Sequence, residues 1–209
     1  MKEKYAVLKH EPGKHREYIG GVGDLWQKIG NLQLEMLRKQ GLRPEHTLLD
    51  LGCGSLRLGI LAIPFLNPGN YFGIDMHQSL IDAGLSHELA ADLQKEKQPN
   101  FFATETFEVD VFATTFDFII AQSVFTHLPV SKIKACIEKL PKVMHKDTKC
   151  FFTFYEFTDT TPAAKIDEEP YHQTQALYAE ISKANGLQFT YIGDWGHPKD
   201  QKLGMLTLC

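Results

Sequence analysis

The sequence has few cysteines and lacks a long hydrophobic run. Its 209 residues include four cysteines, at Cys53, Cys136, Cys150 and Cys209. They are scattered, with no Cys-x-x-Cys pair, which fits neither a zinc site nor a dense disulfide scaffold, so we expect no metal. The longest apolar run, about Leu58 to Leu66, is short and is interrupted by Pro64. We therefore expect no segment that spans a membrane.

An excess of positive charge is also lacking. The formal net charge is −4, which argues against a nucleic-acid backbone as the main partner, because proteins that bind one usually carry a basic face. The N-terminal stretch MKEKYAVLKHEPGKHREY is too polar for a secretory signal. The composition is that of an ordinary globular protein, and the length favours one domain. We expect a cytoplasmic protein, and the sequence indicates no particular oligomeric state.

What the sequence does contain is a glycine turn, in the stretch TLLDLGCGSLRLG from Thr47 to Gly59. The pattern predicts a buried strand, an acid at Asp50, a turn with Gly52 and Gly54, and then a helix. Glycine has no Cβ, so the backbone can bend tightly and a ligand can lie directly against it. A helix that begins there offers unpaired N–H groups. In doubly wound α/β folds, turns of this kind bind nucleotide-like ligands at the sheet edge.

Two residues indicate which class of nucleotide-like ligand the turn is expected to bind. The dinucleotide fingerprint Gly-x-Gly-x-x-Gly requires a third glycine at a position that Arg57 occupies in this chain. Asp50 would repel a pyrophosphate but would attract a cationic amino group. The ligand is therefore expected to be nucleoside-like, to lack a diphosphate and to carry an ammonium group. S-adenosylmethionine meets all three conditions.

Three motifs lie along the chain: DLGCG at residues 50–54, YFGID, which ends at Asp75, and FDFIIAQSVFTHLP at residues 116–129. With these motifs the chain resembles the class I S-adenosylmethionine-dependent methyltransferases. The run GCGSLRLG, with WQKIGNLQ ahead of it and GDWGHPKDQ near the end, resembles a bacterial small-molecule branch of this family. The family's Gly-x-Gly-x-Gly motif usually has its third glycine where this chain has Leu56. The resemblance implies a Rossmann-like, doubly wound α/β sheet of seven strands whose last strand is antiparallel.

The glycine turn and two strand ends are expected to bind this cofactor. Asp75 lies about twenty residues beyond the turn, the spacing at which the second strand ends beside a bound ribose. Its carboxylate can accept hydrogen bonds from both ribose hydroxyls, although it could also cap the next helix. The resemblance places the end of strand 116–121 near the methionine part of the cofactor. The predicted cofactor-binding residues are Asp50, Gly52, Cys53, Gly54, Arg57, Asp75, Met76, Gln122 and Ser123.

Two residues of the turn have alternative interpretations. Cys53 can be read as a nucleophile, but a small residue that fills the turn is the simpler interpretation. Arg57 is expected at the start of the helix, where the helix dipole disfavours a cation. A carboxylate is then expected to compensate its charge. The candidates are Asp50, an acid of the N-terminal arm and the carboxylate of the cofactor.

Three histidines are candidates for the catalytic site. Methyl transfer to a hydroxyl often needs a base, and a neutral histidine suits that task near neutral pH. His127 is our first choice, because it follows the strand at 116–121 by a few residues; a structural role in the THLP turn is its alternative. His172 and His197 are also candidates, with surface loop positions as the alternative. No pair among them has the spacing of a metal site.

The N-terminal part is expected to differ from the rest. Residues 1–22 are polar and predict an extended arm, and the next helix is expected from Asp24, as its capping residue, to about Gln40. Tyr18 and Trp26 lie at the entry of this helix, where they either close over the cofactor or pack as a cover for the sheet. The predicted domains are 1–42, an N-terminal arm and helix acting as a lid or cover, and 43–209, the methyltransferase domain.

In the rest of the chain, strand patterns alternate with helical ones, which argues for a parallel sheet. The predicted strands are 46–51, 71–74, one within 100–111, 116–121, 150–157, 187–194 and 202–208. The predicted helices are one from residue 55 to about 64–69, 77–95, 131–145, which Pro141 should shorten or kink, and 174–184. The loop at 158–170 is the natural place for acceptor specificity.

The sequence thus predicts an enzyme that transfers a methyl group from S-adenosylmethionine to oxygen or nitrogen of a small-molecule acceptor, such as a metabolite or a sugar-like compound. Two other classes stay open. Arg57 and Asp50 disfavour a nicotinamide-dependent oxidoreductase. A non-catalytic protein that binds the cofactor, or a partner, would keep the fold without turnover.

Overall fold

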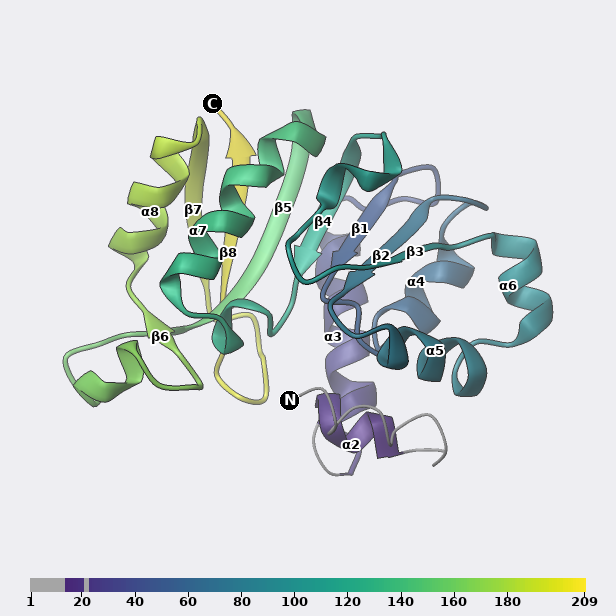
Figure 1. Ribbon diagram of the computed structural model, residues 1–209, viewed down its shortest axis with the longest axis horizontal. Coiled ribbons are helices and arrows are strands. Elements are labelled where there is room, and N and C mark those ends of the chain that lie inside the picture. The colour runs from purple at the N-terminus through teal and green to yellow at the C-terminus, as the bar shows by residue number, and fades with distance from the viewer. Residues whose placement is uncertain (1–13, 21–22) are drawn as a thin grey trace. The chain divides into compact units, whose positions relative to one another are not determined.

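The computed structural model describes residues 14–20 and 23–209, without the side chain of Tyr18. The chain forms two compact units, one up to Glu105 and one from Thr106 onward (Figure 1). Strands alternate with helices along both, which confirms the predicted α/β class. Within the described residues, no helix combines the length and the apolar character that a membrane span requires.

The first unit is built on a parallel sheet with the strand order β3-β2-β1. Its strands are β1 (Leu48–Leu51), β2 (Tyr71–Asp75) and β3 (Asn100–Ala103). Its helices are α2 (Lys14–Gly20), α3 (Leu25–Lys39), α4 (Gly59–Phe65), α5 (Gln78–His87) and α6 (Ala91–Lys97). Every residue of β1 is buried, as expected for a parallel strand covered on both faces.

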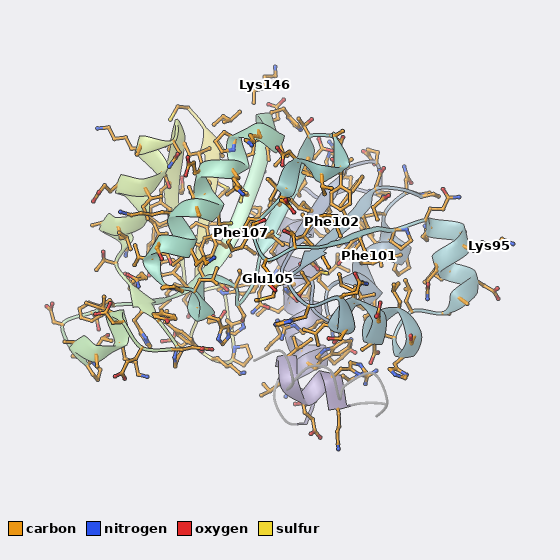
Figure 2. All side chains as sticks on the ribbon, in the orientation of Figure 1. Lys95, Phe101, Phe102, Glu105, Phe107 and Lys146 are labelled. Carbon is orange, nitrogen blue, oxygen red and sulfur yellow. The ribbon has the colours of Figure 1, made fainter. Side chains whose placement is uncertain are left out.

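The core of the first unit lies around β1 and β2. Leu37 of α3 and Leu48 and Leu49 of β1 are fully buried. Phe101 and Phe102 are successive residues of β3 (Figure 2) and therefore point to opposite faces of the sheet. The ring of Phe101 lies 5.9 Å from that of Tyr71, so the edge strand packs against the strand that carries Asp75.

The second unit has the strand order β4-β5-β8-β7, with β6 paired to β5. Its strands are β4 (Phe116–Ala121), β5 (Met144–Glu156), β6 (His172–Gln173), β7 (Leu187–Gly193) and β8 (Lys202–Leu208). Its α-helices are α7 (Val130–Lys139) and α8 (Gln175–Ala184), and its 3-10 helices are η2 (Val109–Phe112), η3 (Phe125–His127), η4 (Leu140–Val143) and η5 (Ala163–Ile166). Because β8 is antiparallel to both β5 and β7, the predicted direction of the last strand is confirmed.

An aromatic core holds the second unit together. The ring of Tyr178, on α8, lies 4.7 Å from those of Phe152 and Phe154 on β5. Phe125 of η3 stacks on Tyr178 at 6.2 Å. Aromatic side chains bury a large area each, so these contacts fix α8 and η3 against β5.

Several predicted boundaries were wrong, each for a local reason. The helix predicted from residue 55 begins at Gly59, because Leu56 has a left-handed backbone with φ +67°. The helix predicted over 77–95 is two helices, α5 and α6, and β5 begins at Met144 instead of residue 150. Pro141 ends α7 and lies in η4, as predicted.

The N-terminal arm also differs from the prediction. Residues 14–20 form the helix α2 instead of an extended segment, and the remainder of the predicted arm lies outside the described residues. Asp24 occupies the cap position of α3. Its carboxylate pairs with Lys28 at 2.8 Å and makes no capping hydrogen bond.

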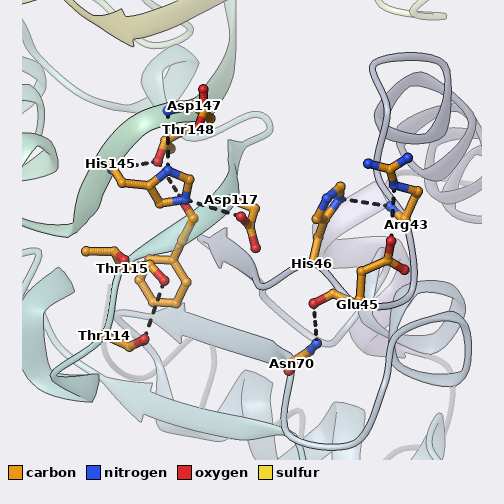
Figure 3. Close-up of polar contacts among 11 residues, drawn as sticks. Arg43, Glu45, His46, Asn70, Thr114, Thr115, Asp117, His145, Asp147 and Thr148 are labelled. Carbon is orange, nitrogen blue, oxygen red and sulfur yellow. Dashed lines mark hydrogen bonds and ion pairs between the residues drawn. The ribbon is translucent and has the colours of Figure 1, made fainter.

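Polar contacts fix the loops at the amino ends of the strands in each unit (Figure 3). In the first unit, Asn70 donates to the carbonyl of Glu45 at 3.0 Å. In the second, His145 Nε2 lies 3.2 Å from Asp117 Oδ1, and the backbone N–H of His145 donates to Thr148 at 2.8 Å. Open α/β sheets bind ligands at the opposite, carboxyl ends of their strands.

Candidate functional site

The glycine turn and Asp75 form one hydrogen-bonded unit. Gly52 and Gly54 have positive φ, at +80° and +54°, which glycine adopts without strain. The backbone N–H of Gly54 donates to Asp75 Oδ2 at 2.9 Å, and the N–H of His77 donates to Asp75 Oδ1 at 2.8 Å. Asp75 therefore holds the turn at the end of β1 against the end of β2.

Asp75 and its neighbour Met76 differ sharply in exposure. Asp75 is 8% exposed, whereas Met76 is 49% exposed. Burial raises the pKa of Asp75, and the hydrogen bonds from the backbone N–H groups of His77 and Gly54 limit the rise. An exposed apolar side chain directly beside a fixed carboxyl group is an arrangement that suits a ligand with hydroxyls and an apolar ring.

Asp50 lies in a buried polar cluster behind the turn. It is 3% exposed, and Tyr71 donates its hydroxyl to Asp50 Oδ2 at 2.7 Å. Burial raises the pKa of Asp50 to about 6, while the hydrogen bond from Tyr71 and the charge of Arg57 oppose the rise. Asp50 is therefore a buried carboxyl group whose charge depends on its neighbours.

Arg57 is the cation next to this cluster. It directly precedes the cap residue of α4, because the helix begins only at Gly59, so it lies at the amino end of the helix but outside its first turn. Arg57 is 6% exposed, and burial lowers its pKa to about 10 while the charge of Asp50 opposes that change. Of the carboxylates considered from the sequence, Asp50 is the one that the described residues place near Arg57.

Cys53 fills the interior of the turn. It is 4% exposed, and its sulfur would lie 3.0 Å from a Cβ added to Gly73. Burial raises the pKa of the Cys53 thiol well above its usual value, and the charges of Asp75 and Asp50 raise it further. These properties favour a small packing residue over a nucleophile, because the thiolate is the reactive form.

The helix α2 packs directly on the glycine turn. A Cβ added to Gly54 would lie 2.9 Å from Cδ1 of Ile19, and Arg57 Nη1 donates to the carbonyl of Ile19 at 3.4 Å. His15 Nε2 lies 2.6 Å from Glu88 Oε1, and Arg16 forms two hydrogen bonds to the same carboxylate. The N-terminal helix is thus fastened to the end of α5.

The entry of α3 contributes a second fastening. The guanidinium of Arg16 lies over the ring of Trp26, 4.7 Å from its centroid, and Trp26 is 2% exposed. Trp26 therefore packs beneath α2 as part of the cover. The side chain of Tyr18 lies outside the described residues.

In the second unit, Gln122 and Ser123 form a tight turn at the carboxyl end of β4. Ser123 has φ +57°, which is uncommon for a residue other than glycine. Its backbone N–H donates to Thr153 Oγ1 at 2.8 Å. The amide nitrogen of Gln122 lies 2.6 Å from Ser123 Oγ and 3.1 Å from Nε2 of His197.

The loop after β7 brings His197 to this turn. His197 is 5% exposed, so the alternative of a surface loop position was wrong for it. Gln201 lies in the same loop; its Oε1 lies 2.7 Å from Thr153 Oγ1 and 3.0 Å from Ser123 Oγ. Sequence reasoning missed Thr153 and Gln201, because nothing in their spacing links them to Ser123.

His127 and His172 have different surroundings. His127, at the end of η3, is 55% exposed, and its Nδ1 lies 2.5 Å from Oε1 of Glu169. His172, on β6, stacks on Tyr155 at 4.9 Å, and its Nδ1 lies 3.1 Å from the carbonyl oxygen of Pro170. His127 is thus the one of the two that is paired with a carboxylate, which sequence reasoning did not identify.

Comparisons with known proteins bear on this arrangement. Residues 49–150 match a family model described as a methyltransferase domain. This range contains the glycine turn, Asp75, Gln122, Ser123 and His127. Residues 49–150 therefore form a methyltransferase domain. The sequence prediction of a methyltransferase is thereby confirmed over that of a nicotinamide-dependent oxidoreductase.

Solved structures of methyltransferases share the fold. A magnesium protoporphyrin IX methyltransferase from Synechocystis PCC 6803, with bound S-adenosylhomocysteine, has 16% identity and a TM-score of 0.67, over 99% of this chain and 94% of that chain. A methyltransferase from Clostridium acetobutylicum has 10% identity and a TM-score of 0.66, over 99% and 98%. A mitomycin 7-O-methyltransferase has 12% identity and a TM-score of 0.70, over 98% and 60%.

These likenesses confirm the Rossmann-like fold with an antiparallel last strand that the resemblance implied. A second structure of the magnesium protoporphyrin IX methyltransferase, 17% identical to this chain with a TM-score of 0.65, holds S-adenosylmethionine, the cofactor that the resemblance implies for this chain.

Proposed function

We propose that this methyltransferase transfers a methyl group to oxygen, or to nitrogen, of a small-molecule acceptor, with His127 as the base. The observation that carries the proposal is the His127–Glu169 pair after the carboxyl end of β4. A carboxylate on Nδ1 orients a histidine ring and fixes its tautomer. An acceptor hydroxyl loses its proton as it is methylated, so this pair suits oxygen best.

The first unit offers side chains whose chemistry matches the ribose, the adenine and the ammonium group of the cofactor. Both oxygens of Asp75 are oriented by backbone N–H groups, and a carboxylate oxygen can accept further hydrogen bonds, here from the ribose hydroxyls. Met76 offers an apolar side chain for the adenine, and Asp50 offers a carboxyl group for the ammonium of the methionine part. In this proposal Gly52, Cys53, Gly54 and Arg57 shape the cradle.

When bound, S-adenosylmethionine supplies a methyl group on a positively charged sulfur. The residues of the chain then have to align the acceptor and take its proton. Gln122 and Ser123 lie at the carboxyl end of β4, the edge at which open α/β sheets bind ligands, and are proposed to flank the reacting groups. His127 would hold the proton at Nε2, while Glu169 keeps Nδ1 in place.

Three observations support a small-molecule acceptor. The net charge of −4 disfavours a nucleic-acid acceptor. The His127–Glu169 pair is half exposed, which leaves it accessible to a diffusing metabolite, including a sugar-like one. Structures that share the fold include the mitomycin 7-O-methyltransferase and a protein titled as an O-methyltransferase family member from Burkholderia thailandensis.

Labelled methyl transfer tests this proposal. The purified protein is incubated with methyl-labelled S-adenosylmethionine and separate pools of hydroxyl, carboxyl, amine and carbon acceptors. We expect label in the oxygen or nitrogen pools, and the methylated atom can be identified by mass spectrometry. Transfer confined to carbon acceptors or to macromolecules would contradict the proposal.

The charge state of Asp50 predicts a pH dependence of cofactor binding. Because its pKa is about 6, Asp50 is mostly protonated at pH 5, and a neutral carboxyl group attracts an ammonium weakly. If only the ionised form binds, affinity for S-adenosylhomocysteine at pH 7.5 should exceed that at pH 5 about tenfold. Calorimetric titration over this range measures it, and Asp50→Asn should bind weakly with a flat profile.

The raised pKa of Asp50 also affects the stability of the folded chain, which it lowers as the pH rises, whereas cofactor affinity is expected to increase. The folded pKa of Asp50 lies above the usual value, so the folded chain binds more protons than the unfolded chain between about pH 4 and pH 6. Its contribution to stability is therefore fully present below about pH 4 and is lost as the pH rises through about 6. A cofactor ammonium beside Asp50 would reverse this loss.

Replacing Arg57 with alanine is expected to weaken cofactor binding several-fold or more. The change removes the charge that opposes the effect of burial on Asp50 and the hydrogen bond to Ile19 on α2. Calorimetry with S-adenosylhomocysteine measures the change. Arg38→Ala, at an exposed position of α3, is the matched control; equal affinity in both variants would sink this assignment.

We also propose that α2 acts as a lid or cover of the glycine turn, within the predicted N-terminal part at residues 1–42. Its support is the contact of Ile19 with Gly54 and the fastening of His15 and Arg16 to Glu88. The side chains of His15 and Glu88 are 0% and 4% exposed, whereas that of Arg16 is 49% exposed, so the His15–Glu88 pair is the part of the fastening that is screened from water.

A further inference from the structure

The Gln122–Ser123 turn belongs to a larger polar cluster at the carboxyl ends of β4 and β5, whose other members have no role in the proposed chemistry so far. We call it the amide cluster; its members are Gln122, Ser123, Thr153, His197 and Gln201. Four of them are at most 5% exposed: Gln122, Thr153, His197 and Gln201. Buried polar groups are costly unless they are hydrogen-bonded, so the arrangement of protons in this cluster is strongly constrained.

The loop after β7 determines which nitrogen of His197 carries a proton. The backbone N–H of Lys199 donates to Nδ1 of His197 at 3.2 Å. A nitrogen that accepts a hydrogen bond carries no proton, so the neutral ring must carry its proton on Nε2. Nε2 is therefore a donor, and it points at the side-chain amide of Gln122, 3.1 Å away.

This tautomer in turn determines the orientation of the Gln122 amide. Two donors cannot share a hydrogen bond, so the group that faces His197 must be the amide oxygen, reached by a half-turn of the amide group. The distance of 2.6 Å between this position and Ser123 Oγ supports the same orientation. It is short for N–H···O but ordinary for O–H···O.

With this orientation the short contacts of the cluster form one circuit, and the long contact of 3.4 Å between the Gln122 amide and Gln201 Oε1 is given up. His197 Nε2 and Ser123 Oγ both donate to the oxygen of Gln122. Gln201 Nε2 donates to Ser123 Oγ at 2.9 Å. Thr153 Oγ1 donates to Gln201 Oε1 at 2.7 Å and accepts from the backbone N–H of Ser123 at 2.8 Å. Each hydroxyl both donates and accepts.

The circuit surrounds a residue with an unfavourable backbone conformation. Ser123 has φ +57°, and such conformations persist only where the surroundings enforce them. The backbone and the side chain of Ser123 are both held by the circuit, through Thr153 and Gln201. The loop that supplies Gln201 is itself closed, because Trp195 Nε1 donates to the carbonyl of Gln201 at 2.8 Å.

We propose that Thr153, His197 and Gln201 are positioning residues that hold the Gln122–Ser123 turn in its reactive geometry. They act through Gln122 and Ser123, and His197 acts in its Nε2–H tautomer without taking the proton of the acceptor. The proposal rests on the proposed function for the role of the turn, and on the geometry of the second unit for the circuit itself.

A spectroscopic measurement tests the circuit without any acceptor. Nitrogen-15 correlation spectra of the full chain at pH 8 distinguish protonated from unprotonated ring nitrogens. We expect Nε2 of His197 to be protonated and Nδ1 to be unprotonated. The reverse tautomer would overturn the proposal, because Gln122 would then be oriented differently.

Kinetics of two variants test the positioning role. Thr153→Val keeps the shape but removes the hydroxyl, and Thr153→Ser restores it. We expect Thr153→Val to lower kcat about tenfold or more, because small misplacements at a reacting edge are costly. The Kd for S-adenosylhomocysteine should change less than about twofold, since the cradle of the cofactor is proposed to lie in the first unit, and Thr153→Ser should recover most of kcat.

The control is Thr190→Val, at a half-buried threonine of β7 outside the cluster, with melting temperatures measured for all variants. An unchanged kcat in Thr153→Val, or equal losses in Thr153→Val and Thr190→Val, would overturn the positioning role. If the wild-type protein methylates no acceptor, the proposed function fails, whereas the tautomer of His197 still decides whether the circuit exists.

Discussion

Replacing Asp75 with alanine should weaken binding of S-adenosylmethionine and S-adenosylhomocysteine at least about a hundredfold. Two charge-assisted hydrogen bonds to the ribose would be lost, at roughly 1.5–3 kcal/mol each, and about 2.7 kcal/mol already corresponds to a hundredfold in affinity. The change also releases the N–H groups of Gly54 and His77, which Asp75 fixes at 2.9 and 2.8 Å. Calorimetric titration of the full chain measures both effects together.

Two further variants separate the loss of the carboxylate from a general loss of structure. Asp75→Asn keeps the size of the side chain but puts an amide nitrogen opposite one of the two backbone N–H groups, so it should also bind poorly. Asp92→Ala, on the exposed side of α6, should bind like the wild type. Near-normal affinity in a folded Asp75→Ala variant would remove Asp75 from the cofactor site.

Replacing His127 with alanine should lower kcat about 10²- to 10⁴-fold, the usual contribution of a general base. Affinity for S-adenosylhomocysteine should be nearly unchanged, because His127 is proposed to contact the acceptor and not the cofactor. Glu169→Gln should retain a hydrogen bond to the ring but hold it less firmly than the carboxylate does, because hydrogen bonds to charged groups are stronger. We therefore expect an intermediate loss of kcat in that variant.

The matched control for His127 is His145. It is also paired with a carboxylate, Asp117, at 3.2 Å, but it lies at the amino end of β5 (Figure 3). His145→Ala should retain full activity. Full activity of His127→Ala, or loss of cofactor binding in it, would show that His127 is not the base, and His172 would then be the next candidate to test.

The strands could be predicted where the local pattern decides the structure. β4 and β8 were predicted with the boundaries that the structure has, because each is a short run of strand-forming residues between clear turns. The start of α4 could not be predicted in this way. Its delay depends on Leu56 at φ +67°, which is buried and is held there by the surrounding core.

The site residues that lie in local motifs could be predicted from the sequence, whereas those that distant loops bring together could not. The glycine turn and Asp75 lie in short motifs, and the sequence identified them as neighbours from their spacing. Glu169 lies 42 residues from His127, and Gln201 lies 78 residues from Ser123. Their proximity depends on how the loops after β5 and β7 fold back on β4, which no local pattern records.

The sequence predicts that the N-terminal part is a lid or cover, but it does not predict the helix α2. The segment KHREYIG is short and polar, so it carries no helical periodicity of apolar residues, and an extended arm was the natural prediction. Its helix is stabilised by the tertiary contacts of His15 and Arg16 with Glu88. Such contacts between distant segments override weak local preferences.

Calorimetric titration of the wild-type chain with S-adenosylmethionine, S-adenosylhomocysteine and NAD tests the central claim most directly. We predict saturable binding of the first two, each at one site per chain, and no measurable binding of NAD. That result would establish the cradle as a cofactor site that is competent for methyl transfer. Binding of NAD alone would contradict the account, because a glycine turn with Arg57 in the third-glycine position and Asp50 before it should reject a diphosphate.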